Sequence, residues 1–127
     1  MQTYKFSNEE HIMQIDIQAR SFTLTNALKI YAEEKLKSSF SRCQDHLNRI
    51  VVRLSDINGP RGGEDKLCHI HVVLPGISDV IIEDTEQDMY AAIDRAIDRA
   101  GNAVERKVDR QQSALRHQRP LRNYLSA

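Results

Sequence analysis

The chain has 127 residues, of which 40% are hydrophobic and 28% are charged, so we expect one domain with a single core. No apolar run approaches membrane-spanning length, and the N-terminus lacks the basic-then-apolar order of a signal peptide. Both observations predict a cytoplasmic protein without a membrane partner. The 18 Lys and Arg residues balance 18 Asp and Glu residues, a neutral sum that by itself disfavours nucleic-acid binding.

The first half of the chain predicts a strand followed by a helix. Residues 11–19 alternate apolar and polar side chains, which is the period of a half-buried strand. Thr23 or Thr25 can cap a helix over residues 27–40. The apolar stripe expected on that helix consists of Leu28, Tyr31, Ala32, Leu36 and Phe40.

The middle of the chain predicts three strands, at residues 47–54, 66–74 and 77–83. The segment NGPRGGEDK at 58–66 joins the first two, and its glycines and proline indicate a loop. A Pro-Gly turn joins the last two strands. The strand at 66–74 is expected to place Cys68, Ile70, Val72 and Leu74 on one face and His69, His71 and Val73 on the other.

The stretch from 88 to 112 predicts an amphipathic helix that carries two rows of charge. Its apolar stripe consists of Met89, Ile93, Ala96, Ile97, Ala100, Val104 and Val108. A basic row consists of Arg95, Arg99, Arg106 and Arg110. A parallel acidic row consists of Asp94, Asp98, Glu105 and Asp109.

Segments at both ends are expected to lie outside the main domain, which we place at residues 11–113. Residues 1–10 are predicted to be a flexible leader. Residues 114–127 form a basic tail interrupted by Pro120, and we expect the helix to continue into it only briefly.

The order of these elements is β-α-β-β-β-α, which predicts a two-layer α+β sandwich. The last three strands should form an antiparallel meander, and a right-handed crossover through the first helix places the first strand parallel to a neighbour. The result is a four-stranded mixed sheet with two helices on one face. The open face is expected to show Gln14, Asp16, Arg49, Arg53, His69 and His71.

The sequence does not favour a metal, cofactor or catalytic site. Cys68 faces away from His69 and His71 on a strand, so these residues, with Cys43 or His46 added, cannot converge on one tetrahedral zinc ion. The glycine-rich loop matches neither GxxxxGK[ST] nor GxGxxG. We therefore expect no enzyme activity, no metal, no cofactor and no small-molecule substrate.

The arginine row has two interpretations, a solvated helix face or a surface for phosphates. From 79 to 94 every charge is acidic, whereas basic residues outnumber acidic ones from Arg95 onward, so a basic surface can exist on a neutral protein. Arg95 precedes Asp98 by three positions, a weaker orientation for a helical ion pair. We therefore expect the arginines to remain available to a partner.

Two segments carry a resemblance to a known family. LTNALKIYAEEKLKSSF at 24–40 and EDTEQDMYAAIDRAIDRAGNAVERKVDRQ at 83–111 resemble the two helices of the ribosome hibernation-promoting factor family, also called the ribosome-associated inhibitor or sigma-54 modulation family. The strand pair before Pro75 and Gly76 is also similar. The resemblance covers nearly everything between 11 and 112, and the chain looks like a short form without the extra C-terminal domain of longer members.

The resemblance implies a cytoplasmic stress-response factor that binds ribosomal RNA of the small subunit near the decoding region. Such a factor blocks messenger and transfer RNA binding, and so causes ribosome hibernation and regulates translation. The matching RNA-binding positions are Lys29, Lys35, Lys37, Arg95, Arg99, Arg106, Lys107 and Arg110. The basic tail either follows the messenger channel or has no fixed structure.

A second hypothesis belongs to another class. The chain could instead be a cytosolic protein-interaction or self-associating module, including a homodimer, that uses the open sheet face or a sheet edge. Val51, Val73 and Ile81 on the outward face would serve this role.

Overall fold

The computed structural model describes the backbone at residues 2–7, 12–57 and 66–126, and side chains at 14–57 and 66–115. The elements are β1 (Gln2–Ser7), β2 (Ile12–Arg20), α1 (Asn26–Phe40), the 3-10 helix η1 (Ser41–His46), β3 (Arg49–Asp56), β4 (Lys66–Val73), β5 (Val80–Glu86) and α2 (Met89–Ser126). No helix in the described part of the chain is long and apolar enough to cross a membrane.

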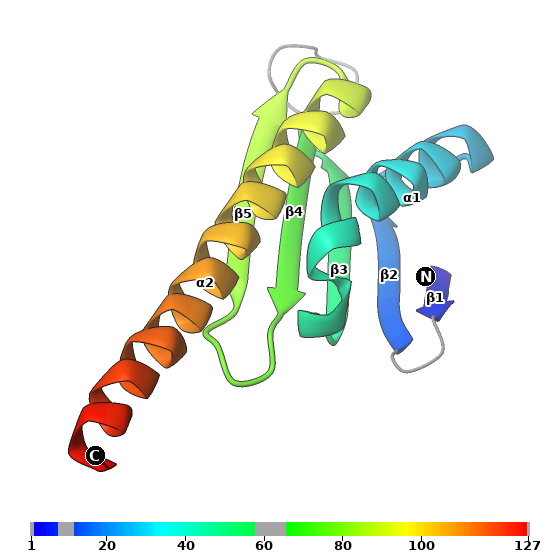
Figure 1. The fold of residues 1–127 in the computed structure, drawn as a ribbon. Coiled ribbons are helices and arrows are strands. Elements are labelled where there is room, and N and C mark those ends of the chain that lie inside the picture. The colour runs from blue at the N-terminus through cyan, green and yellow to red at the C-terminus, as the bar shows by residue number, and fades with distance from the viewer. Residues whose placement is uncertain (1, 8–11, 58–65, 127) are drawn as a thin grey trace.

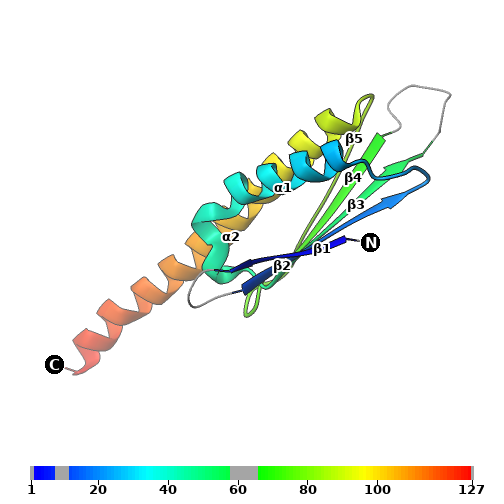
Figure 2. The same cartoon turned by 90° about the vertical axis from the view of Figure 1, so that its right-hand side faces the viewer.

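The sheet is mixed and carries both long helices on one face (Figures 1 and 2). Its strand order is β1-β2-β3-β4-β5, with β2 and β3 parallel and the other neighbours antiparallel. α2 packs on β4 and β5, and α1 lies beside α2. The predicted α+β sandwich of order β-α-β-β-β-α is confirmed, with β2 to β5 as its four strands.

A fifth strand, β1, extends this sheet from the segment that we predicted to be a leader. It pairs antiparallel with β2 from Gln2↔Ile17 to Ser7↔Ile12. Without it, β2 would present an unpaired edge next to the parallel β2–β3 ladder, and an open edge of this kind is a liability for a soluble protein. The segment is short and is followed by no glycine or proline turn signal, so its pattern did not identify it as a strand.

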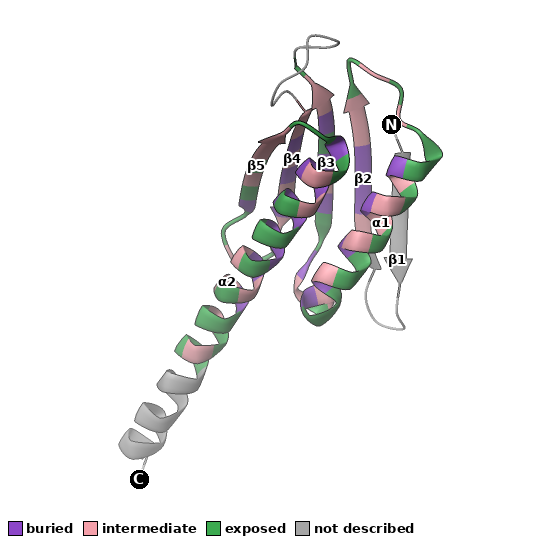
Figure 3. Cartoon of the chain, turned by 90° about the horizontal axis from the view of Figure 1, so that it is seen from above, coloured by how far each residue is buried: buried purple, intermediate pink, exposed green. Residues whose placement is uncertain are grey.

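The core lies between the sheet and the helices (Figure 3). The stripe predicted on α1 is buried at Leu28, Ala32, Leu36 and Phe40, and Tyr31 is partly buried. Alternation along β4 is also as expected, because Cys68, Ile70 and Val72 are fully buried whereas His69 and His71 lie on the opposite face. Every predicted apolar position on α2 from Met89 to Val108 belongs to the core.

Asp16 lies on the open face as expected, beside Val51 of β3, but it is only 1% exposed, so the expectation that it is open to solvent is wrong. β2 is an inner strand between β1 and β3, so its neighbours flank Asp16 on both sides. Arg49 satisfies the buried carboxylate by donating from Nε to Oδ2 at 2.7 Å and also from Nη2. The charge is therefore buried with a partner that itself reaches solvent, as a buried carboxylate requires.

The ends of the elements have local causes. Thr25, and not Thr23, caps α1, because its hydroxyl accepts a hydrogen bond from Leu28 N at 3.2 Å. Asp88 plays the same role for α2 through Ala91 N at 3.2 Å. Gly76 has a φ of +77°, and this turn delays the start of β5 to Val80, three residues later than we predicted.

The prediction that the last helix continues only briefly beyond 112 is wrong, because α2 continues to Ser126. Alanine, leucine and arginine are frequent after Gln112, and their helix propensities are high. Pro120 removes one backbone donor, but it does not end the helix in this structure.

Gly101 provides a test of how closely the helices pack. A Cβ built at this position would lie 3.4 Å from Ser39 O and 3.7 Å from Ser39 Cβ, so one methyl group fits and a larger side chain does not. We expect G101A to increase the free energy of unfolding by up to about 1 kcal/mol through helix propensity. G101L should decrease it by about 1–3 kcal/mol through overpacking. Urea denaturation followed by circular dichroism would measure both, and a destabilised G101A would contradict the contact.

Candidate nucleic-acid interface

The two charged rows of α2 lie on opposite flanks of its buried stripe. The acidic row faces α1, where Tyr31 donates to Asp94 Oδ1 at 2.6 Å and Lys35 Nζ lies 2.9 Å from Asp98 Oδ1. The hydrogen bond to Asp94 raises the pKa of Tyr31, with smaller contributions from burial and nearby carboxylates. Tyr31 also meets Tyr90 edge-to-face, with ring centroids 4.9 Å apart. These acids therefore help to join the helices.

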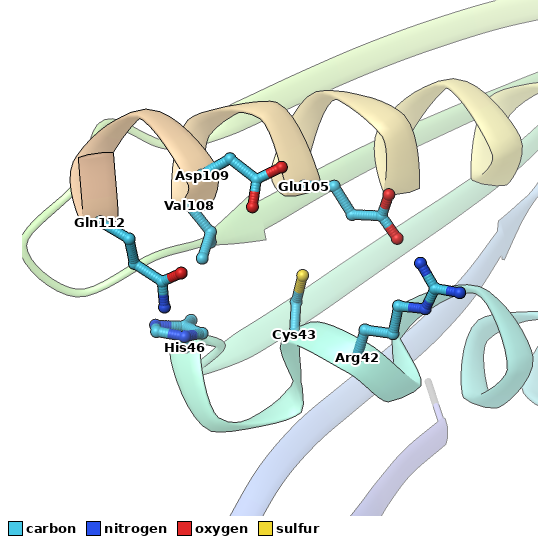
Figure 4. A pocket seen from close by; sticks show the side chains of 7 residues that line it. All are labelled: Arg42, Cys43, His46, Glu105, Val108, Asp109 and Gln112. Carbon is cyan, nitrogen blue, oxygen red and sulfur yellow. The ribbon is translucent and has the colours of Figure 1, made fainter.

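Further along the same flank, residues of η1 and α2 line a pocket of about 170 Å³ that is open to solvent (Figure 4). Its lining consists of Arg42, Cys43, His46, Glu105, Val108, Asp109 and Gln112. Burial, followed by the charges of Glu105 and Asp109, raises the pKa of the Cys43 thiol, so the sulfur is held in its unreactive protonated form. Within the described residues, no group of three His, Cys, Asp or Glu side chains could hold a metal ion.

The other flank brings the first half of the arginine row against β5. Arg99 Nη1 donates to Asp84 Oδ2 and to Glu83 O, both at 2.9 Å. Arg95 Nε lies 3.7 Å from Asp84 Oδ1 and 3.6 Å from Glu86 Oε2. We expected weak pairing within the helix, and the ion pairs of Arg95 and Arg99 indeed run to another element, but the sequence did not predict these partners on β5. The guanidinium groups still reach solvent, with side-chain exposures of 64% for Arg95 and 53% for Arg99.

Lys107 is held by the turn between β4 and β5. Its Nζ lies 3.1 Å from Ser78 O, 2.6 Å from Ser78 Oγ and 3.1 Å from Asp79 O. His71 Nε2 lies 2.7 Å from Asp79 Oδ2 on the other side of this turn, and this hydrogen bond lowers the pKa of Asp79. Lys107 thus anchors α2 to the turn with all three ammonium donors directed at protein oxygens.

The second half of the arginine row is more open. Arg106 and Arg110 are exposed, and together with Asp109 they line a shallow hollow of about 450 Å³. Arg110 Nε donates to the main-chain oxygen of Arg106 at 3.4 Å. On α1, Lys37 is exposed and Lys29 is half-buried, and both make further interactions.

The eight predicted RNA-binding residues consequently fall into two groups. Four of them contact other elements of the protein at the distances given above, namely Lys35, Arg95, Arg99 and Lys107. The second group consists of exposed Lys37, Arg106 and Arg110 and half-buried Lys29. The sequence indicated the cations but did not identify Asp84 and Glu86 as their partners. Strand alternation places both on the helix-facing side with Val80 and Ile82, once β5 is set at Val80–Glu86.

On the sheet, Cys68 is isolated from the histidines by the thickness of the strand. Burial, with a smaller effect from Asp84, raises the pKa of the Cys68 thiol to about 12. On the open face, His69 Nδ1 lies 3.9 Å from Glu83 Oε2. Cys68 and the two histidines therefore cannot act together on one ligand.

The contacts of Arg99 predict a difference in stability between two charge reversals. R99E removes two hydrogen bonds and places a carboxylate beside Asp84, whose side chain is only 10% exposed. We expect a loss of about 1–2 kcal/mol in the free energy of unfolding. R106E changes an exposed side chain and should remain within about 0.5 kcal/mol of the original chain. Equal effects in urea denaturation would show that the contact with β5 has no energetic role.

The chain is similar to known proteins in sequence and fold. Residues 15–112 match the family model described as Sigma 54 modulation protein / S30EA ribosomal protein. The chain is similar to the N-terminal domain of Protein Y from Thermus thermophilus, with 36% identity and a TM-score of 0.59, over 72% of this chain and 93% of that one. A ribosomal subunit interface protein from Coxiella burnetii has a similar fold, with 23% identity and a TM-score of 0.60, over the same shares of 72% and 93%.

No curated protein matches the sequence. The family match nevertheless covers β3, β4 and β5 completely and includes both helix segments that carried the resemblance. The chain therefore belongs to the sigma 54 modulation protein / S30EA ribosomal protein family.

Proposed function

We propose that the chain is a ribosome-associated translation inhibitor, a hibernation factor that binds small-subunit ribosomal RNA near the decoding region and blocks messenger and transfer RNA. Family membership supports ribosome association, as does the similarity to a ribosomal subunit interface protein. The observation that carries the proposed mode of binding is the exposed, basic outer side of α2 at Arg106 and Arg110.

The mechanism needs no chemical step. Guanidinium groups offer a planar fork of donors that matches phosphate oxygens, and contacts of this kind follow the RNA backbone without reading bases. A rigid helix that spans the sheet would hold Arg106 and Arg110 at a fixed separation, since the helix is locked by its buried stripe. Inhibition would then result from occupying the site where other RNAs bind.

The proposed contacts differ in exposure and in the partners that they already have. Arg106, Arg110 and Lys37 are exposed, which supports them as the main phosphate contacts, with half-buried Lys29 contributing less. Arg95 and Arg99 would contribute less at first, because carboxylates of β5 already neutralise them. Lys35 and Lys107 would act mainly by fixing α2 to α1 and to the β4–β5 turn.

The alternative, a protein-interaction or self-associating module, has one observation in its favour. Ile81 is 60% exposed on the open sheet face, in the same row as Val51 and His71. A single exposed isoleucine is common on soluble proteins and does not define a contact surface. We therefore retain the ribosome proposal and let the experiment decide between the two faces.

The test compares two double charge reversals by cosedimentation with purified small subunits. R106E/R110E should lower the affinity by at least about tenfold at low salt, because it replaces two phosphate contacts with repulsion. R20E/R53E makes the same change in net charge at exposed sheet residues and should leave the affinity within about twofold. Binding of the original chain should weaken steeply between about 50 and 200 mM salt.

Two results would reject this assignment. One is loss of binding in R20E/R53E with R106E/R110E unaffected, which would favour the open sheet face. The other is binding that does not respond to salt, since phosphate contacts require such a response.

A further inference from the structure

Arg95 and Arg99, the first half of the arginine row, already lie beside carboxylates of the protein itself. We propose that Asp84 and Glu86 of β5 form an autoinhibitory contact, in which their carboxylates compete with RNA phosphates for Arg95 and Arg99 and so limit the affinity of the chain for the ribosome. This inference rests on the proposed function, because it concerns regulation of the same surface.

Asp84 is placed for this role by the sheet register. It pairs with the fully buried Cys68, so it points to the helix-facing side of the sheet, where α2 packs on β5, the edge strand. The carboxylate therefore lies beneath the guanidinium groups, with its side chain 10% exposed. The guanidinium groups above it are more than half exposed, so an incoming phosphate can reach them.

The geometry at Arg99 occupies one of its terminal nitrogens fully. Nη1 carries two hydrogens, and its contacts at 2.9 Å with Asp84 Oδ2 and Glu83 O account for both. A bidentate grip on a phosphate through the two terminal nitrogens would require Nη1 to leave the carboxylate. Nε and Nη2 keep the other three donors, so a phosphate can still approach on that side, but it meets a guanidinium whose charge Asp84 already partly neutralises, and the gain in affinity is smaller.

Charge leads to the same conclusion at Arg95. Its distances of 3.6 and 3.7 Å to Glu86 and Asp84 exceed hydrogen-bond length, so the interaction is mainly electrostatic. Two guanidinium groups and two carboxylates sum to zero within this cluster. Arg106 and Arg110 differ, because in the described part of the chain the hydrogen bond between them is to a main-chain oxygen, and Asp109 is the one carboxylate that lines their hollow, so two guanidinium groups there face one acidic group.

The pairs are poorly explained as stabilising elements alone. The two contacts of Arg95 are long and its side chain is 64% exposed, so they contribute under about 1 kcal/mol, whereas the pair of Arg99 with the largely buried Asp84 contributes more. Acidic residues on the helix-facing side of a strand are also unfavourable for core packing. β5 has two of them, at the alternate positions 84 and 86, so a role besides stability would explain their presence. Limiting the strength of phosphate binding provides one.

The experiment removes one carboxylate in the full-length chain and measures affinity for purified small subunits at several salt concentrations. D84N should bind about threefold to tenfold more tightly at low salt, and its dependence on salt should become steeper as Arg95 and Arg99 gain phosphates. The matched control is E34Q, which makes the same charge change at an exposed position on α1. E34Q should bind within about twofold of the original chain.

E86Q provides a second variant in case D84N disturbs folding near Cys68, since Glu86 contacts only Arg95 among the pairs of this cluster, and its side chain is 28% exposed. It should also bind more tightly, by a smaller factor than D84N. Circular dichroism would confirm that each variant is folded before binding is measured.

Equal affinities for D84N, E86Q and E34Q would overturn the autoinhibitory contact. Weaker binding by folded D84N or E86Q would also overturn it, since the acids would then position the arginines for RNA. In both cases R106E/R110E could still lose binding, and the proposed function would stand. If the original chain and every variant failed to bind small subunits, the proposed function and this inference would both be rejected.

Discussion

The packing of α2 across β4 and β5 is the constraint on which the rest of the structure depends. Its apolar stripe fixes the rotation of the helix, because Ile93, Ile97 and Val104 must all be buried. Once the rotation is fixed, one charged row must face α1 and the other must face β5. Burial of the apolar stripe therefore determines which charged residues meet on each flank, and the ion pairs do not have to orient the helix themselves.

This constraint also explains how a neutral chain can have an uneven surface. Acidic residues of α2 are used against Tyr31 and Lys35 of α1, and acidic residues of β5 are used against Arg95 and Arg99. Arg106 and Arg110 lie beyond the end of these acidic partners. The net charge of the chain is therefore a poor predictor of phosphate binding, and the position of each charge along α2 is a better one.

The features of the fold that depend on local pattern could be predicted from the sequence. The 3.6-residue period of α2 and the alternation of β4 each identify a buried face without knowledge of any neighbour. β1 and Asp16 could not be predicted in this way, because both depend on a pairing with a distant segment. Asp16 lies on the inner strand β2, and its buried charge has a partner because Arg49 of β3 is within reach.

The candidate site likewise has features that follow from local pattern and features that depend on distant segments. The identity of the cations was visible in the sequence, since a helical row of arginines needs only the spacing of Arg95, Arg99, Arg106 and Arg110. Which of them are paired was not visible, because Asp84 reaches Arg99 only when the turn at Gly76 sets the register of β5. A shift of one residue in that register would turn Asp84 and Glu86 to the open face and remove their pairs with Arg95 and Arg99. The availability of the arginine row to RNA thus depends both on the helix that carries it and on the β4–β5 turn that precedes β5.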